Sequence, residues 1–256
     1  IVTHLTDKQS AVERVKPYLN MEMDVGYATF EYHFFFDNKE LVYLYKKSSP
    51  TTLKFESLLI NGKEVLQYDF DLNDGFVTLA GTKTLNLKPS IENNISRIKY
   101  VRSNAILDDT EENKVFNDFI NFVDKMLLFY SLDRNSYIGF KIGSESISAY
   151  IVETGKTKEF ESFLNKFNVN VKLSEKEIDG EKKLMVHYKN SDVSFYSVAS
   201  SGTKSLALFF YWFTQMEEAS FVFMDEFDAF YHFELAKEIV KLLLPLKKVQ
   251  ILFTTH

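Results

Sequence analysis

Residues 221–256, which read FVFMDEFDAFYHFELAKEIVKLLLPLKKVQILFTTH, carry the clearest structural pattern in the chain. Phe221–Met224 and Val249–Thr254 are apolar at successive positions, which is typical of strands buried on both faces. Phe233–Leu246, between them, has the spacing of an amphipathic helix. A strand, a helix and a second strand in this order predict a βαβ unit in a parallel sheet, with a right-handed crossover.

Ionisable side chains follow both predicted strands. Asp225 and Glu226 come directly after the first strand, and His256 follows the second. Because ligands of open α/β sheets bind beyond the carboxyl ends of the strands, we expect these side chains to converge on one rim. A carboxylate there can hold Mg²⁺ between nucleotide phosphates, and a second can act as general base toward water. The alternative is that both acids only cap the following helix.

A second candidate site precedes an apolar helix that is predicted over Thr203–Glu218. The segment Ser200–Ser205 reads SSGTKS. Free backbone N–H groups and the positive end of the helix dipole suit a phosphate group, and Gly202 allows a close approach of the backbone. The alternative is an ordinary serine N-cap, which needs only one of these residues.

The order of these motifs resembles that of ATP-binding-cassette ATPases. Ser200–Ser205, Phe221–Glu226 and Thr254–His256 follow one another as the signature motif, the Walker B motif and the switch histidine do in that family. The variant with Ser-Gly-Thr-Lys and with Asp-Glu-Phe-Asp-Ala-Phe-Tyr-His is similar to the stand-alone prokaryotic group related to RecF, SMC proteins and OLD-family nucleases. Many members of that group resemble ATPases of anti-phage defence systems. The match covers roughly the last quarter of the chain, and three motifs in order are a specific signal.

The resemblance implies a role for each matching residue. Asp225 would bind Mg²⁺, and Glu226 would be the catalytic base. His256 would contact the γ-phosphate as the switch histidine and share the catalytic role. The residues that would bind the ATP held by an opposing protomer are Ser200, Ser201, Gly202 and Thr203.

The sequence departs from the family pattern in three ways. The signature reads Ser-Ser-Gly-Thr, so the usual glutamine contact is lost. His232 stands where transporters usually have an acid that crosses the dimer interface, although an ordinary surface histidine is an alternative. No G-x-x-x-x-G-K-[ST] phosphate loop occurs, and GFKIGS at Gly139–Ser144 does not fit it. The family order leads us to expect this loop upstream of Ile1; the alternative is a degenerate ATPase.

Residues 1–100 are expected to hold an N-terminal helix and an antiparallel β-lobe. Residues 7–19 have apolar side chains at helical spacing, whereas alternation from Gly26 to Leu87 predicts strands. The Asn61-Gly62 dipeptide suits the positive φ angles of a type I′ hairpin turn.

Residues 101–193 are expected to form an inserted α+β lobe, a lid or a docking surface for a partner. A helix beginning near Asp109, with Glu112 at capping-box spacing, has an apolar stripe that continues to Leu127. The other elements predicted in this segment are a helix over Lys156–Phe167 and strands over Val169–Leu173 and Leu184–Tyr188. Residues 194–256 would then be the ATPase core. The predicted fold class is α/β, an ATP-binding-cassette (P-loop NTPase-like) core with a β-lobe and an inserted lobe.

Composition limits the classes of protein to which the chain can belong. It has 256 residues and is 45% hydrophobic, which is enough for a sizeable core. The net charge of −6 counts against an unspecific nucleic-acid binder. The absence of cysteine excludes disulfides and thiolate metal sites, and fits a cytoplasmic location. The apolar runs are too short to span a membrane, so no membrane partner is expected.

These observations favour an ATP-binding and ATP-hydrolysing switch subunit that dimerises on ATP. By the resemblance, it would control a nuclease-like effector protein in anti-phage defence, with a phage protein or DNA as trigger. One alternative is a metal-dependent nuclease with two-metal chemistry at Asp225, Glu226 and Asp228. Another is a scaffold that senses nucleotide without hydrolysing it.

Overall fold

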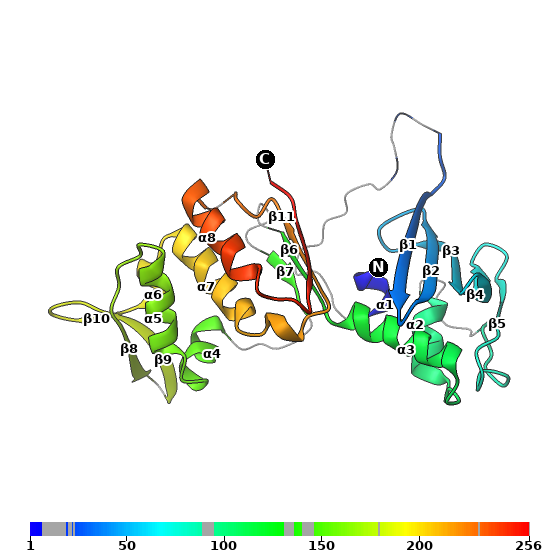
Figure 1. Cartoon of the computed structure of the whole chain (residues 1–256), viewed down its shortest axis with the longest axis horizontal. Coiled ribbons are helices and arrows are strands. Elements are labelled where there is room, and N and C mark those ends of the chain that lie inside the picture. The colour runs from blue at the N-terminus through cyan, green and yellow to red at the C-terminus, as the bar shows by residue number, and fades with distance from the viewer. Residues whose placement is uncertain are drawn as a thin grey trace. The chain divides into compact units, whose positions relative to one another are not determined.

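The computed structural model describes residues 1–6, 19, 22, 24–88, 95–130, 136–139, 146–178, 180–229 and 231–255 (Figure 1). The chain forms two compact units, Ile1–Asp124 and Lys125–His256. The segment limits expected near residues 100 and 193 therefore lie inside these units. No helix among the described residues is long and apolar enough to cross a membrane.

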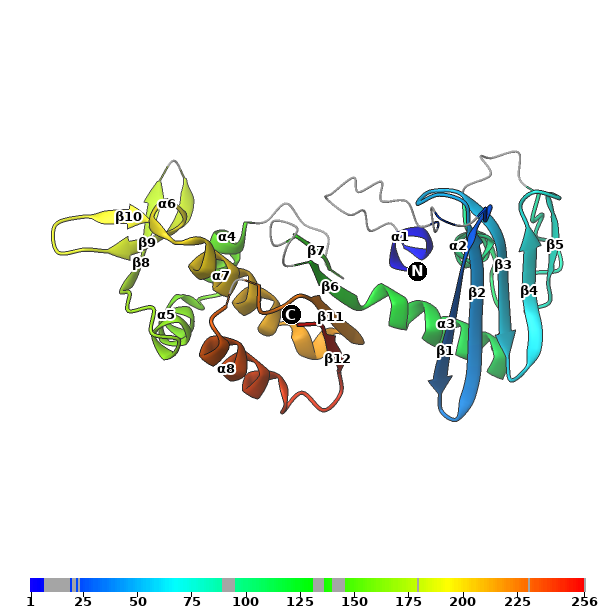
Figure 2. The ribbon, with the colours of Figure 1, turned by 90° about the horizontal axis from the view of Figure 1, so that it is seen from above.

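The first unit is built on a five-stranded antiparallel sheet in which neighbours in sequence are neighbours in space (Figure 2). Its strands are β1 (Ala28–Phe36), β2 (Lys39–Lys47), β3 (Leu53–Ile60), β4 (Lys63–Asp69) and β5 (Asp74–Val77). Asn61 and Gly62 have φ angles of 49° and 75°, as the predicted hairpin turn requires. The predicted β-lobe is confirmed, but its last strand ends at Val77 and does not reach Leu87.

Three helices accompany this sheet: α1 (Val2–Leu5), α2 (Arg97–Asn104) and α3 (Glu111–Asp124). The predicted apolar stripe of α3 packs on β1 and β2, where the Phe119 ring lies 5.1 Å from that of Phe34 and 5.8 Å from that of Tyr43. The predicted cap at Asp109 is wrong: the Asn113 N–H donates to the Thr110 hydroxyl at 3.2 Å. The helix expected over residues 7–19 lies outside the described residues, apart from Leu19.

A buried carboxyl group joins β3 to β2 and α2. Glu56 is fully buried and accepts hydrogen bonds from the Tyr43 hydroxyl at 2.8 Å and from the Arg97 backbone N–H at 2.7 Å. The buried Arg97 guanidinium lies 4.2 Å from the centroid of the Tyr68 ring. Burial raises the pKa of Glu56, and hydrogen bonds from Ser96, Tyr43 and Arg97 oppose that rise.

The second unit contains a four-stranded sheet in the order β12-β11-β6-β7. Its strands are β6 (Met126–Tyr130), β7 (Ser136–Ile138), β11 (Phe221–Asp225) and β12 (Gln250–Phe253). β11 pairs in parallel with both β12 and β6, so the predicted βαβ unit is confirmed, with α8 (Phe233–Leu243) as its helix.

The strand β6 corrects the sequence-based prediction, which placed Met126 and Leu127 on a helix. The helix ends at Asp124, and Met126–Tyr130 forms a strand between β11 and β7. Five successive apolar residues fit a buried strand as well as a helix, and periodicity cannot separate the two. The parallel pairing of Met126–Tyr130 with β11 shows that this segment is a strand.

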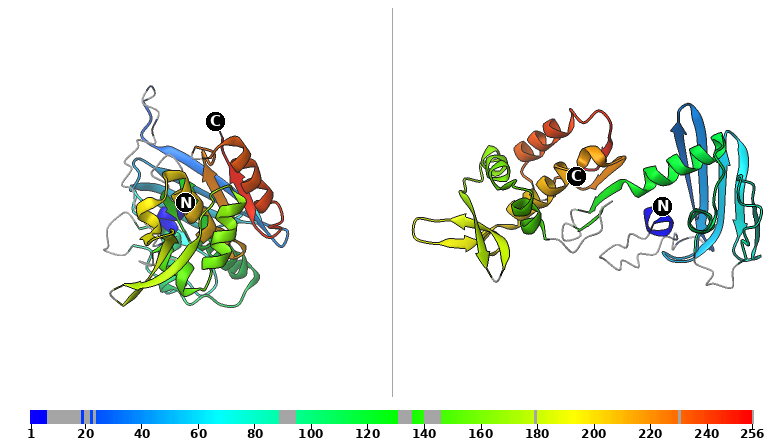
Figure 3. Two further views of the ribbon diagram at one scale, coloured as in Figure 1. Left: turned by 90° about the vertical axis from the view of Figure 1, so that its left-hand side faces the viewer. Right: turned by 90° about the horizontal axis from the view of Figure 1, so that it is seen from below.

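Helices α7 (Ser201–Phe213) and α8 share an apolar core with this sheet (Figure 3). Trp212 of α7 is fully buried in the same cluster as Val222 of β11 and Ile239 of α8. The helix predicted over Thr203–Glu218 is divided: α7 ends at Phe213, and a short 3₁₀ helix, η1, follows over Met216–Glu218.

A small antiparallel sheet completes the second unit, in the order β10-β9-β8. Its strands are β8 (Leu173–Ile178), β9 (Glu181–His187) and β10 (Asp192–Ser194), and helices α4 (Ile147–Glu153), α5 (Thr157–Lys166) and α6 (Phe195–Val198) accompany them. The predicted α5 helix is confirmed. The strand predicted over Val169–Leu173 is wrong, because the strand begins only at Leu173.

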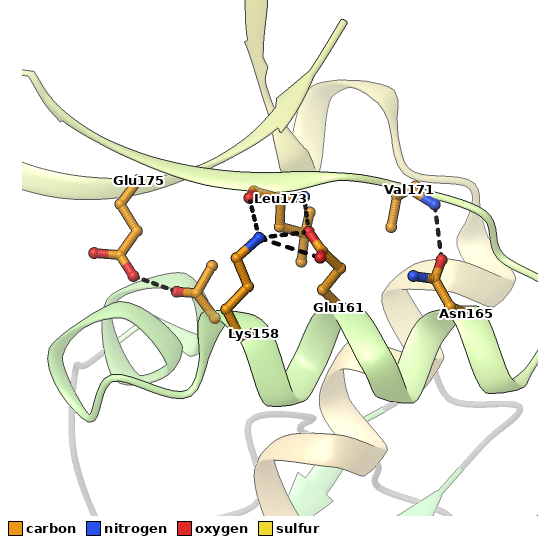
Figure 4. A network of polar contacts seen from close by, with 7 residues as sticks. Lys158, Glu161, Asn165, Val171, Leu173 and Glu175 are labelled. Carbon is orange, nitrogen blue, oxygen red and sulfur yellow. Dashed lines mark hydrogen bonds and ion pairs between the residues drawn. The ribbon is translucent and has the colours of Figure 1, made fainter.

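Helix α5 covers the free edge of β8 with polar side chains (Figure 4). Glu161 accepts a hydrogen bond from the Leu173 N–H, and Asn165 accepts one from the Val171 N–H at 3.1 Å. The Thr157 hydroxyl donates to the Glu175 carboxylate at 2.6 Å. Side chains four residues apart on the helix therefore match alternate residues along the extended chain. The backbone N–H groups of Val171 and Leu173, at the start of this edge, are therefore satisfied within the unit.

We expect Glu161→Ala to lower the free energy of unfolding by about 1–3 kcal/mol, because the Leu173 N–H loses its acceptor. The Leu173 N–H bond is also the largest cause of the lowered pKa of Glu161. Urea denaturation followed by circular dichroism measures the loss. Glu161→Gln is the matched control, since its amide oxygen still accepts a hydrogen bond and should preserve most of the stability. An alanine variant as stable as wild type would show that the contact is unimportant.

Candidate functional site

Asp225 and Glu226 lie at the carboxyl end of β11. Asp225 is the last residue of the strand and pairs with Tyr130 of β6, and Glu226 follows it. Both acids are half-buried. Because β12 runs parallel to β11, its carboxyl end reaches the same rim, as the sequence predicted. His256, the third predicted member of the rim, lies outside the described residues.

Thr254, directly after β12, joins the two acids. Its hydroxyl donates to Asp225 Oδ1 at 3.0 Å and accepts from the Glu226 backbone N–H at 2.7 Å. Its carbonyl oxygen accepts from the Phe227 N–H at 3.1 Å, and its N–H donates to the Met224 carbonyl at 3.0 Å. Thr254 belongs to the predicted switch motif, but no role for it follows from the sequence.

Glu226 has a left-handed backbone conformation, with φ of 48°. For a residue other than glycine this conformation costs about 1–2 kcal/mol. Its N–H is held by Thr254, and its carbonyl oxygen accepts from the Ala229 N–H at 3.0 Å. Strained backbone that surrounding hydrogen bonds hold in place is frequent at functional sites, because it aims a side chain.

The acids fit Mg²⁺ that is shared with a nucleotide. Mg²⁺ in proteins is usually held by one or two carboxylates together with substrate phosphates and water. Asp225 and Glu226 supply such oxygens at one strand end. Among the described residues, no three His, Asp or Glu side chains gather as a metal cage. Asp228, the third acid of the nuclease alternative, has a buried Oδ1 atom without a hydrogen-bond partner, and no observation favours that alternative.

The predicted phosphate-contacting segment lies at the N-terminus of α7. Ser200 is the N-cap, and its Oγ accepts from the Thr203 N–H at 3.1 Å and pairs with the Thr203 hydroxyl at 2.9 Å. Ser200 therefore caps the helix, as expected from the alternative interpretation of an ordinary serine N-cap. Ser201 and Gly202 occupy the first turn, where backbone N–H groups have no acceptor within the helix. Ser201 is exposed and Gly202 half-exposed.

The structure thus forms two separate groups of predicted site residues within the second unit. Asp225 and Glu226 are joined through Thr254, whereas Ser200 and Thr203 bond to each other at α7. His232 is the exposed N-cap of α8 and makes no side-chain capping bond. A role for His232 at an interface stays a prediction.

The parallel strands β6, β11 and β12, their flanking helices and the two acids at the end of β11 fit the α/β core of a nucleotide-binding ATPase. The family model described as "AAA domain, putative AbiEii toxin, Type IV TA system" matches residues 30–256. The chain belongs to this family of AAA ATPase domains, whose class of activity is ATP binding and hydrolysis. The prediction of an ATPase domain is confirmed at this level, and the anti-phage group stays a prediction.

Among solved structures, the chain is similar to the SMC head domain from Thermotoga maritima, with 16% sequence identity and a TM-score of 0.39. The alignment covers 91% of this chain and 65% of that one, so the chain spans less than two thirds of the length of that structure. A comparison with curated proteins found no match.

Proposed function

We propose that the chain is the switch subunit of an ATPase that binds ATP with Mg²⁺, hydrolyses it and dimerises in the ATP-bound state. The observation that carries this proposal is the arrangement of Asp225, Thr254 and Glu226 at the carboxyl end of β11, in a member of the AAA family.

Each acid has a distinct task in this proposal. Asp225, whose Oδ1 is fixed by Thr254, holds Mg²⁺ directly or through water. Bound Mg²⁺ supplies positive charge that stabilises the phosphoryl group during transfer. Glu226 accepts a proton from the attacking water as general base. His256, two residues after Thr254, contacts the γ-phosphate in the proposed site.

The N-terminus of α7 supports a composite site. Ser201 and Gly202 lie in the first turn of the helix, whose N–H groups suit the phosphates of an ATP held by a second protomer. Each ATP would then lie between two protomers, and loss of its γ-phosphate would release them. A partner protein would then detect ATP binding as a change from monomer to dimer.

The partner in this proposal is a nuclease-like effector, and the setting is anti-phage defence with a phage protein or DNA as trigger. The family description names a toxin and a type IV toxin–antitoxin system, and so favours control of a harmful activity. Co-purification of the neighbouring gene product with and without ATP tests this part of the proposal. A partner that binds equally in both states would contradict it.

We expect Asp225→Asn to raise the Mg²⁺ concentration for half-maximal ATP hydrolysis at least about 10-fold, because an anionic ligand becomes neutral. Titration of Mg²⁺ into the metal-free full-length protein, with phosphate release as readout, measures the change. Asp192→Asn, which alters an exposed aspartate bonded to His187, is the matched control. An unchanged Mg²⁺ requirement in Asp225→Asn would exclude Asp225 as the ligand.

A further inference from the structure

We propose that Thr254 is a positioning residue, which sets the Asp225 carboxylate and the Glu226 backbone through one hydroxyl group. This inference rests on the proposed function and deepens it. The juxtaposition that carries it is the Thr254 Oγ1 atom between Asp225 Oδ1, at 3.0 Å, and the Glu226 N–H, at 2.7 Å.

A hydroxyl group can make both of these hydrogen bonds at the same time. A hydroxyl has one hydrogen to donate and can accept through its lone pairs. Thr254 donates that hydrogen to Asp225 and accepts from Glu226, so its orientation is fixed from both sides. Oδ1 of Asp225 is thereby oriented by the protein. Outer contacts of this kind orient metal ligands in many sites.

Backbone hydrogen bonds of Thr254 fix the position of its hydroxyl group. Its N–H and carbonyl bond to Met224 and Phe227, so all polar groups of Thr254 bond to the four-residue segment Met224–Phe227. This segment contains both acids and the left-handed residue Glu226. The end of β12 therefore holds the end of β11 in one geometry.

A positioning role differs from a merely structural one in what its loss changes. Thr254 is exposed, so the two groups that lose its hydroxyl can bond to water instead. Loss of the hydroxyl should therefore affect folding little. Its effect on the metal site should be larger, because outer-shell changes lower metal affinity by about 10–100-fold.

The test compares Thr254→Val, which removes the hydroxyl at constant shape, with Thr254→Ser, which keeps it. Mn²⁺ binding in the presence of ATP is measured by electron paramagnetic resonance on the full-length protein, together with kcat and KM for ATP. We expect the valine variant to bind Mn²⁺ about 10-fold more weakly and to lose kcat with little change in KM. The serine variant should stay within about twofold of wild type, because it retains the same donor and acceptor.

The control is Thr29→Val, the same exchange at an exposed position of β1, which should change neither readout. A Thr254→Val variant with wild-type Mn²⁺ affinity and kcat would overturn the positioning role while leaving the ATPase proposal intact. A wild-type protein that binds no Mn²⁺ with ATP and hydrolyses none would overturn both.

Discussion

Glu226→Gln should lower the kcat of ATP hydrolysis by at least about 100-fold, since general-base catalysis contributes about 10²–10⁴-fold. The amide has the shape of the carboxylate but cannot take the proton of the attacking water. ATP binding should persist, so the variant should accumulate as an ATP-bound dimer. Phosphate release measures the first effect, and light scattering after gel filtration with ATP measures the second.

Glu217→Gln provides the matched control, because it makes the same exchange at an exposed position of η1. It should hydrolyse ATP at the wild-type rate. If Glu226→Gln also keeps the wild-type rate, the general base is another group. If it loses hydrolysis but remains a monomer with ATP bound, the catalytic role stands and the dimer proposal fails.

Glu56→Ala should lower the free energy of unfolding by at least about 2 kcal/mol, because each buried donor left without its acceptor costs about 1–3 kcal/mol. The substitution leaves the Arg97 N–H and the Tyr43 hydroxyl without their acceptor. It also leaves the buried Arg97 guanidinium without the nearby carboxyl group. Urea denaturation measures the loss. Glu31→Ala, which removes an exposed carboxylate on β1, should cost no more than about 1 kcal/mol.

The raised pKa of Glu56 predicts how the stability of the protein depends on pH. Burial raises the pKa of Glu56 above its ordinary value of 4.5, so the folded state retains the proton longer than the unfolded state. Its contribution to stability is therefore fully present below pH 4.5 and declines as the pH rises through the raised pKa. Comparison with Glu56→Gln, which stays neutral, isolates this change. The stability of wild type relative to Glu56→Gln should fall as the pH rises, and a relative stability that rises with pH would contradict the sign.

Local sequence patterns were sufficient to predict much of the fold. Alternation and the Asn61-Gly62 turn located β3 and β4, because side-chain period and turn chemistry are local properties. The strand β6 was missed because Met126 and Leu127 continue a helical spacing, and only pairing with β11 distinguishes the two structures. The start of β8 was misplaced because Val169 and Val171 alternate as in a strand, whereas the Val171 N–H bonds to the Asn165 side chain of α5.

The candidate site was predictable in its residues but not in its internal bonds. The order of the motifs located Asp225 and Glu226, and the βαβ pattern placed them at the rim with the end of β12. The role of Thr254 depends on the spacing of β11 and β12 in three dimensions, for which one sequence has no signal. The left-handed conformation of Glu226 was also unforeseen, because that conformation favours Gly and Asn.

Steady-state phosphate release from ATP by the full-length wild-type protein, with Mg²⁺ and then with EDTA, is the decisive measurement for the ATPase proposal. We predict slow turnover that depends on Mg²⁺ and stops when the metal is removed. Absence of both hydrolysis and calorimetric ATP binding, with the partner protein present, would instead identify the chain as a scaffold and refute the roles proposed for Asp225, Glu226 and His256.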